Sequence, residues 1–353
     1  VEYCRGSFPG TFNAPLMADN ERHLVGRNFK KNGQLSAIEL GHQLVSGKIK
    51  KQRIDNWMNF INQNPSGVLY CFRGGLRSEI VQKWIFDYSG ITYPRVKGGY
   101  KAMRHYLIEE SNRITNSKNF IVIGGQTGCG KTLLLNKFRN NIDLEGLANH
   151  RGSAFGNNVS SQPTQINFEN SLAIELIQKQ KNRFLLIEDE GNNIGNIYLP
   201  NCLRNRSVKS NIVVLKENLE ERVKLSLKTY VTDMLDNYCS VDSKNGFENY
   251  ANYWKNSLYK IQKRLGGARY KELLKVLIQW NCNKIYVLFT DLMQKQNLQI
   301  FFPQRFLQRS IVRLFVRFTS MQNLVPQLVQ QVQEYLTLTQ TLMVDGQLRN
   351  SKV

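Results

Sequence analysis

The chain has 353 residues, and its 48 Lys and Arg against 27 Asp and Glu give a formal net charge of +21. This length exceeds that of one ordinary core and predicts two or three domains. A hydrophobic content of 41% with only 8 Pro excludes collagen-like, disordered and small disulfide-scaffold proteins. The charge favours a polyanionic partner, nucleic acid before an anionic membrane surface, and a merely basic soluble protein is the alternative.

No apolar run approaches the roughly 20 residues that a membrane-spanning helix needs, and the N-terminus lacks the apolar core of a signal peptide. We therefore expect a soluble, cytoplasmic protein with reduced cysteines. The cysteines are scattered, without a CxxC pair or a histidine spacing typical of zinc. They are Cys4, Cys71, Cys129, Cys202, Cys239 and Cys282.

The first strand-loop-helix pattern carries a cysteine. An apolar run from residue 67 ends at Cys71, and a helical pattern begins at residue 79. Backbone amides, the helix dipole and Arg77 would surround the thiol as an anion cradle and lower its pKa. Gly74 and Gly75 are expected to adopt positive φ and to let the backbone approach an oxyanion.

Two chemistries share this cysteine pattern. Rhodanese-type sulfurtransferases carry sulfur on the cysteine, whereas cysteine phosphatases carry a phosphoryl group. The Cys-x5-Arg spacing matches the phosphatases and is one residue longer than the commonest sulfurtransferase loop, but no general acid can be placed nearby. A buried structural cysteine is the third interpretation.

The second strand-loop-helix pattern is a Walker A motif. A helix over 100–113 leads to a polar boundary at 115–119, and the buried strand that follows ends in GQTGCGKT from Gly125 to Thr132. The backbone amides from Gly128 to Thr132, including that of Gly130, should cradle phosphates. Lys131 should reach a terminal phosphate, and the Thr132 hydroxyl should bind Mg²⁺.

Acidic residues follow a third apolar run, at 184–187. Asp189, or alternatively Glu188, is the candidate for organising the metal, although an ordinary acidic strand end is equally compatible. A further strand is predicted at 211–215, and 247–280 is predicted to be helical with an interruption at 266–267. The P-loop does not specify the reaction by itself.

Several segments together resemble the bacterial tRNA 2-selenouridine synthases. The resemblance covers about residues 1–275 and includes segments that P-loop proteins do not generally share. These segments are Cys71–Ser78, Lys97–Ala102, the P-loop, Asp143–Gly156, Gln162–Asn170, Ile187–Glu190 with Ile194 and Gly195, and Arg264–Tyr270.

We expect an α/β fold in three parts, of which the resemblance implies the first two and a shift in composition after Trp280 marks the third. These are a rhodanese-like domain at 1–115, whose first strand is expected to be missing, a parallel-sheet P-loop domain at 116–280 with a helical C-terminal segment, and a divergent tail at 281–353. In the tail, arginines four apart suggest a basic amphipathic helix. A change of reading frame in the source sequence is slightly favoured over such a helix as the explanation of the tail. The arginines are Arg305, Arg309, Arg313 and Arg317.

The resemblance also implies a transferase acting on tRNA. Its members replace the sulfur of 2-thiouridine at the wobble position by selenium from selenophosphate, and they attach a geranyl group from geranyl diphosphate to that sulfur as the apparent intermediate. We expect no tightly bound cofactor, with Mg²⁺ as a candidate ion. A selenophosphate-supplying enzyme is a candidate partner.

Residue roles follow from the same resemblance. Cys71 would be the thiolate needed for selenation, with Arg73 and Arg77 lowering its pKa and holding the selenium donor. Asp143, Glu145, His150 and Arg151 would line the phosphate site, although a structural role is as compatible for each alone. A helical segment that interleaves aromatic and basic residues is expected to contact tRNA. The expected contacts are Tyr253, Trp254, Lys263, Arg264 and Arg269. An amphipathic helix whose aromatic side chains lie in the protein core is an equally compatible interpretation.

Two other functional hypotheses compete with the transferase. One is a rhodanese and P-loop protein that binds tRNA and phosphate ligands without catalysis. The other is a cysteine phosphatase joined to a kinase-like domain, which the family-like segments disfavour.

Overall fold

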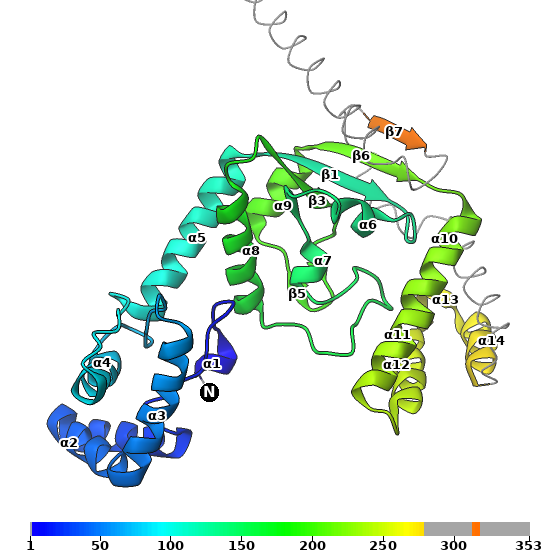
Figure 1. Ribbon diagram of the computed structural model, residues 1–353. Coiled ribbons are helices and arrows are strands. Elements are labelled where there is room, and N and C mark those ends of the chain that lie inside the picture. The colour runs from blue at the N-terminus through cyan, green and yellow to red at the C-terminus, as the bar shows by residue number, and fades with distance from the viewer. Residues whose placement is uncertain (1, 279–312, 318–353) are drawn as a thin grey trace, which may run out of the picture. The chain divides into compact units, whose positions relative to one another are not determined.

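The computed structural model describes residues 2–278 and 313–317 (Figure 1). The chain forms two compact units. Unit 1 comprises Val1–Arg113 with Glu169–Ile174, and unit 2 comprises Ile114–Phe168 with Glu175–Val353. Within the described ranges, no helix combines the length and the apolar character that crossing a membrane requires.

Unit 1 is helical, and its core contains Trp57, Trp84 and Tyr93. The strand expected before Cys71 is reduced to one parallel bridge, between Leu69 and Arg95. A rhodanese-like sheet is therefore not seen in the described part of this unit, and that assignment stays a prediction. The helices are α1 Glu2–Arg5, α2 Asp19–Leu44, α3 Gly47–Gln63, α4 Leu76–Ser89 and α5 Gly99–Ser117.

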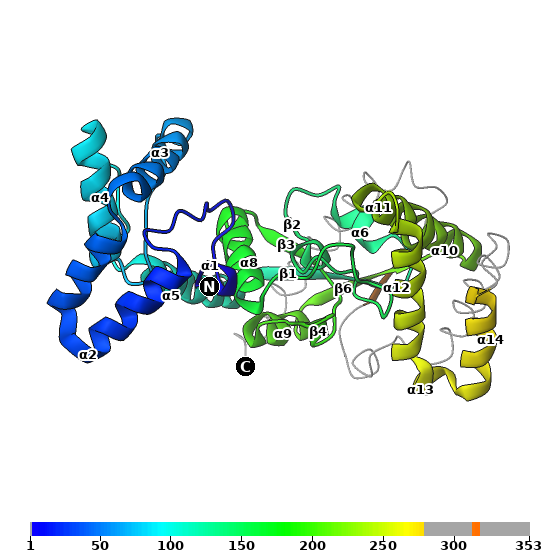
Figure 2. The same ribbon diagram turned by 90° about the horizontal axis from the view of Figure 1, so that it is seen from below.

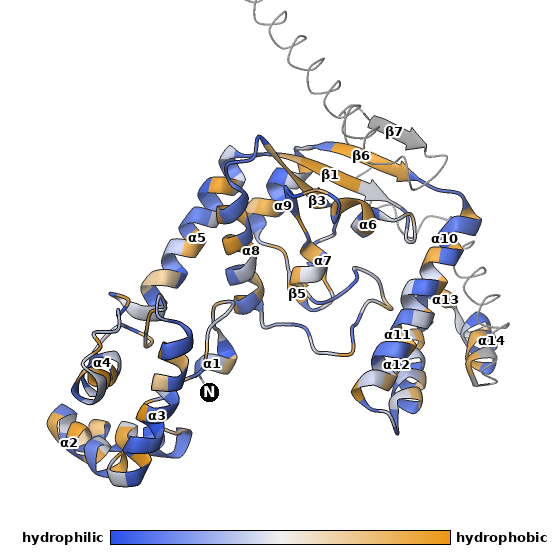
Figure 3. Cartoon of the chain, in the orientation of Figure 1, coloured by the Kyte–Doolittle hydropathy of each residue, from blue (hydrophilic) through white to orange (hydrophobic). Residues whose placement is uncertain are grey.

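Unit 2 is built on a parallel sheet in the order β2-β3-β1-β6-β7. The middle residues of its central strands are hydrophobic (Figure 3), as expected for strands covered on both faces. The three predicted strands are confirmed as β1, β3 and β6. The bounds are β1 Asn119–Gly125, β2 Asn141–Ile142, β3 Phe184–Glu188, β6 Asn211–Lys216 and β7 Arg313–Arg317.

The arginine repeat of the tail does not form a helix in its described part. Arg313–Arg317 is the strand β7, which pairs in parallel with β6 from Ile212 to Lys216. The physical reason is that the outer edge of β6 offers unpaired backbone groups, which an added strand satisfies. Arg305 and Arg309 lie outside the described residues.

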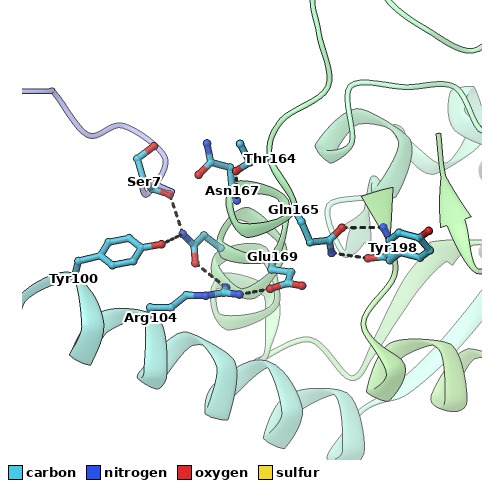
Figure 4. Close-up of polar contacts among 9 residues, drawn as sticks. Ser7, Tyr100, Arg104, Thr164, Gln165, Asn167, Glu169 and Tyr198 are labelled. Atoms are coloured by element: carbon cyan, nitrogen blue, oxygen red, sulfur yellow. Dashed lines mark hydrogen bonds and ion pairs between the residues drawn. The ribbon is translucent and has the colours of Figure 1, made fainter. Parts of the chain in front are cut away.

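Short helices and an antiparallel strand pair complete the surroundings of the sheet. Thr164 caps α8 by accepting a hydrogen bond from the Asn167 amide, and the Gln165 side chain bonds both backbone groups of Tyr198 (Figure 4). These bonds fasten the start of α8 to β5. The elements are α6 Lys131–Leu135, α7 Leu144–Leu147, α8 Gln165–Lys179, β4 Asn193–Ile194, β5 Ile197–Tyr198 and α9 Asn201–Val208.

A helical layer follows β6. Its core is aromatic, with Tyr250 and Trp254 buried between helices, and α14 packs against α12 (Figure 2). Gly266, with φ of 78°, separates α13 from α14. The elements are α10 Leu219–Ser226, the π-helix η1 Leu227–Thr232, α11 Asp233–Val241, α12 Gly246–Lys260, α13 Gln262–Leu265 and α14 Gly267–Ile278.

A buried polar cluster completes unit 1. The side chain of Asn170 is fully buried; it accepts a hydrogen bond from Arg104 at 2.8 Å and donates one to the Ser7 carbonyl at 2.8 Å. Arg104 also pairs with Glu169 (Figure 4). Because a buried amide must have its hydrogen-bonding groups satisfied, this cluster specifies how residues near Ser7 meet α5 and α8.

We expect Asn170→Ala to lower the free energy of unfolding by about 1–3 kcal/mol, because it leaves buried partners of the amide unsatisfied. The measurement is urea unfolding followed by circular dichroism. Asn205→Ala, at an exposed position of α9, is the control. Equal unfolding midpoints for the two variants would contradict the assignment.

Candidate functional site

The P-loop leaves the carboxyl end of the central strand. β1 ends at Gly125, and the loop turns into α6 at Lys131 (Figure 1). Gly128 and Gly130 have φ of 79° and 83°, values that other residues rarely adopt. Lys131 Nζ donates to the Gly125 carbonyl at 3.0 Å. A parallel sheet places ligands at this edge, so the loop is positioned to hold phosphate groups.

Helix α10 braces the P-loop from outside. Arg222, only 3% exposed, donates from Nε to the Thr127 carbonyl at 3.0 Å. A Cβ at Gly128 would lie 2.6 Å from both the Arg222 carbonyl oxygen and Ser226 Oγ. Gly128 is therefore required by close packing as well as by its dihedral angle.

Carboxylates converge beside Thr132. The Thr132 hydroxyl donates to Glu188 Oε1 at 2.7 Å and lies 3.2 Å from Glu145 Oε2. Carboxylate oxygens of Glu145, Glu188 and Glu190 lie within 4.8 Å of one another. We call these three residues the carboxylate cluster.

Burial dominates the electrostatics of the carboxylate cluster. Together with the neighbouring Glu145, it raises the pKa of Glu188 to about 8, while Thr132 and Lys131 act in the opposite direction. Burial and the two other carboxylates raise the pKa of Glu190. Crowded, buried carboxylate oxygens next to a hydroxyl are the hard ligands that Mg²⁺ prefers, so these residues fit the ion predicted for Thr132.

The structure distinguishes between the two candidate acids, Asp189 and Glu188, because only Glu188 lies in the carboxylate cluster. Asp189 lies outside the carboxylate cluster, and its backbone amide donates to the Ile123 carbonyl at 2.9 Å. Glu188 and Glu190 occupy the site instead. β3 ends at Glu188, and the Glu190 amide donates to the Glu188 carbonyl at 3.1 Å, so a tight turn brings both carboxylates to the cluster.

The loop after α7 forms a wall of the carboxylate cluster. A Cβ at Gly152 would lie 2.7 Å from Glu190 Oε2 and 2.8 Å from Glu145 Oε1. Arg151 donates to the Thr229 carbonyl at 3.0 Å and lies over the ring of Tyr230, 5.5 Å from its centroid. The π-helix η1 thus supplies the anchor for Arg151, in keeping with the frequent occurrence of π-turns at functional sites.

His150 and Asp143 have structural positions. His150 is 5% exposed, and its ring fits between two glycines: Cβ atoms at Gly156 and Gly195 would each come within 2.8 Å of it. Burial lowers the pKa of this imidazole. Asp143 caps α7 by accepting from the Gly146 amide at 2.7 Å. Both residues therefore shape the loop, and the Asp143 charge also acts on Glu145 and Glu188; their place on the phosphate site stays a prediction.

Gln162 connects the loop after α7 to the strand pair of β4 and β5. Its amide donates to the carbonyls of Ala148 and Ile194, each at 3.0 Å, and its Oε1 accepts from the Asn196 amide at 2.8 Å. Segments that are far apart in the sequence therefore meet around His150.

The cysteine loop of unit 1 is held by the first turn of α5 and by the segment that precedes this helix. The Tyr100 amide donates to the Cys71 carbonyl at 2.9 Å, and Arg95 donates to the Gly74 carbonyl at 2.9 Å. Gly74 has φ of 67°, and a Cβ there would lie 2.6 Å from the Gly99 amide nitrogen. Gly75 has φ of −98°, so the positive φ predicted for it is wrong.

The cysteine loop stabilises a thiolate. Burial alone raises the pKa of Cys71, but the Ser78 hydroxyl, the Ser78 and Arg73 amides and the Arg77 charge together hold that pKa below its ordinary value. Cys71 Sγ lies 3.3 Å from Ser78 Oγ. Arg77 also pairs with Glu2 at 2.7 Å, and Arg73 is exposed. Ser78 is therefore the closest support of the sulfur.

The aromatic rings expected to stack on tRNA bases are buried. Tyr253 and Trp254 are 8% and 2% exposed in the aromatic core of the helical layer, so they are closed to a nucleic acid. The reason is that the aromatic face of α12 packs inward. Lys263 and Arg264 are exposed, and Arg269 pairs with Glu272 at 2.5 Å.

Comparison with known proteins bears on both units. A curated tRNA 2-selenouridine synthase from Marinobacter nauticus is 48% identical to this chain, over 79% of the chain and 77% of its own length. The chain belongs to the tRNA 2-selenouridine synthase family. A family model described as the tRNA 2-selenouridine synthase AAA domain matches residues 118–284. The corresponding proteins of Hahella chejuensis and of a Sulfurovum species are each 46% identical, over 78% and 77% of the chain and 74% and 75% of their own lengths. No solved structure matches.

The P-loop site and the cysteine loop both include residues that the sequence motifs did not single out. Glu190 lies beyond the end of β3, and the tight turn between Glu188 and Glu190 brings it to the cluster. Ser78 follows Arg77 in the first turn of α4, where a hydroxyl can face the preceding loop. No local pattern marks Arg222 or Tyr230, because tertiary packing alone brings them to the loops.

We expect Ser78→Ala to raise the pKa of Cys71 and to slow its alkylation several-fold near neutral pH, because a support of the thiolate is lost. The measurement is the rate of iodoacetamide labelling of Cys71 against pH, by peptide mass spectrometry. Ser78→Thr should retain the low pKa. Ser89→Ala, in the same helix, is the control; a similar shift in that variant would contradict the role of Ser78.

We expect Gly152→Ala to weaken the binding of Mg²⁺ and diphosphate by about 10- to 100-fold, because the methyl group displaces the carboxylates that would hold the ion. Titration calorimetry with inorganic diphosphate and Mg²⁺ measures this. The matched control is Gly191→Ala, where a Cβ meets nothing within 4 Å. Equal affinities for both variants would refute the assignment.

Proposed function

We propose that this protein replaces the sulfur of 2-thiouridine at the tRNA wobble position by selenium from selenophosphate, through an S-geranyl intermediate made from geranyl diphosphate. The observation that carries the proposal is the P-loop with its carboxylate cluster, in a chain 48% identical to a curated tRNA 2-selenouridine synthase. We further propose that the reaction takes place in the cytoplasm, because the proposed substrate is a tRNA.

In the first half, the sulfur of 2-thiouridine attacks C1 of geranyl diphosphate. The C–S bond forms as the C–O bond breaks, the base loses its N3 proton to solvent, and diphosphate leaves. The P-loop amides and Lys131 stabilise the charge that develops on the departing diphosphate. For this contact Lys131 exchanges its bond to the Gly125 carbonyl for a phosphate oxygen.

Mg²⁺ would be held by the carboxylate cluster and Thr132, and it would neutralise charge on the diphosphate. The protein side chains keep the oxygens convergent: Gly152 leaves room for them, and Thr132 orients Glu188 through its hydroxyl.

In the second half, selenium of selenophosphate attacks C2 of the modified base, and geranylthiolate leaves and takes up a proton. Water cleaves the Se–P bond and releases phosphate. Selenium and sulfur both keep the −II oxidation state, so no oxidant or reductant is consumed. The alkylated sulfur leaves more readily than a thiocarbonyl sulfur because it departs as a thiolate.

We assign the cysteine loop to this second half. Arg73 and Arg77 would hold the anionic selenium donor, and the Cys71 thiolate, supported by Ser78, would be required for selenation. The two halves then depend on different anion-binding loops, which makes them separable by mutation.

We expect the protein, given 2-thiouridine tRNA, geranyl diphosphate and selenophosphate, to form geranylated and selenated uridine. Lys131→Ala should reduce both products at least about 100-fold, because a charge that stabilises the leaving diphosphate is lost. Cys71→Ser should abolish selenation while geranylation persists. Nucleoside mass spectrometry after digestion measures both products.

Lys137→Ala, at an exposed position after α6, is the matched control and should leave both products unchanged. Binding of tRNA without either product would support the binding-only alternative. Loss of geranylation in Cys71→Ser would contradict the division of labour between the loops.

A further inference from the structure

A break in α2 creates a groove in unit 1. The helix changes direction at Gly33, where φ is 83° and ψ is −174°. Across the break, Asn28 donates from Nδ2 to the Ser36 carbonyl at 2.9 Å and to its hydroxyl at 3.0 Å. The two arms of α2 are therefore held in a defined relation, and the space between them is built into the fold.

The groove between these arms has a volume of about 530 Å³. Cationic and amide side chains line most of it, and Glu39 is the acid in its wall. Amide groups of this kind donate to and accept from the edges of nucleobases, while the cations attract phosphates. The polar lining residues used below are Arg27, Asn28, Lys31, Asn32 and Gln43.

The positive charge at the groove is not neutralised by ion pairs. Within the described ranges of the chain, the ion pairs of α2 are made by Asp19, Glu21 and Arg22, and none involves Arg27, Lys30 or Lys31. Unpaired cations on one face form the electrostatic footprint of a polyanion-binding surface.

An exposed aromatic ring lies within the same stretch. Phe29 is 54% exposed, although it is a large apolar side chain. Phe29 stands between Asn28 and Lys30 and is not one of the lining residues, so its ring lies beside the groove on the same helix arm. Single-stranded RNA is held by this combination, because bases stack on rings while basic groups neutralise the phosphates.

We infer that the α2 groove binds a single-stranded loop of the substrate tRNA, with Arg27 and Lys31 on phosphates and Phe29 stacked on an unpaired base. The inference rests on the proposed function, since it takes tRNA as the substrate. Amide groups in a hollow favour RNA over a membrane surface, which needs only an apolar face and charge. The groove thus provides the contact with tRNA bases that was expected of Tyr253 and Trp254, which are buried.

The test measures binding of 2-thiouridine tRNA to the full chain by fluorescence anisotropy at several salt concentrations. We expect R27A/K31A to raise Kd about tenfold and to make the log–log salt slope shallower by about 1.4, from two contacts at about 0.7 each. Phe29→Ala should raise Kd about tenfold, and Phe29→Tyr should restore binding by keeping the stacking face.

The matched charge control is K181A/K209A. These exposed lysines precede β3 and β6, at the sheet edge opposite the P-loop. Their substitution removes two positive charges, as R27A/K31A does. The control should bind tRNA as the wild type does. In turnover assays R27A/K31A should raise KM for tRNA and leave KM for geranyl diphosphate unchanged.

The outcomes separate the two claims. Wild-type protein that modifies tRNA, with groove variants that bind it equally tightly, overturns the groove assignment alone. Wild-type protein that neither binds nor modifies tRNA overturns the proposed function. Groove variants that lose binding to phosphatidylserine vesicles while retaining tRNA binding assign the surface to a membrane and overturn the inference.

Discussion

Mutual repulsion among buried carboxylates is the constraint around which unit 2 is organised. Glu188 is 2% exposed and lies within 4.8 Å of two other glutamates. Such a cluster is costly without counter-charge, because ionised groups in a low-dielectric interior must be paired. The fold supplies a nearby Lys131 and the Thr132 hydroxyl, and the proposed Mg²⁺ and diphosphate would supply the rest. Packing of Gly152 and Arg151 maintains the convergence.

The P-loop and the cysteine loop have similar backbone geometry but are held in place by different contacts. Each uses a glycine with positive φ and a turn into a helix. The P-loop is braced by a buried arginine from a distant helix, whereas the cysteine loop is braced by a local serine and by the first turn of α5. The distant brace connects the P-loop to the helical layer, whereas the local braces of the cysteine loop come from its own unit.

The features that could be predicted from the sequence are local ones. The strands β1, β3 and β6 are apolar runs, and the P-loop has a fixed spacing. The burial of Trp254 could not be predicted, because an amphipathic helix does not reveal whether its aromatic face meets protein or ligand. The choice of Glu188 over Asp189 depends on which side of β3 faces the P-loop. Arg313–Arg317 became a strand because the edge of β6, which no local pattern describes, offers a partner.

The buried amide of Asn170 has a consequence for the order of assembly. It bonds Ser7 across 163 residues, so unit 1 requires a turn of α8 that is synthesised after the P-loop. At about 5–20 residues per second, a ribosome needs on the order of 10–30 s to join the two ends of this contact. Although most of unit 1 comes first in the chain, it cannot finish folding first. A fragment cut after Arg113 would lack its last structural piece.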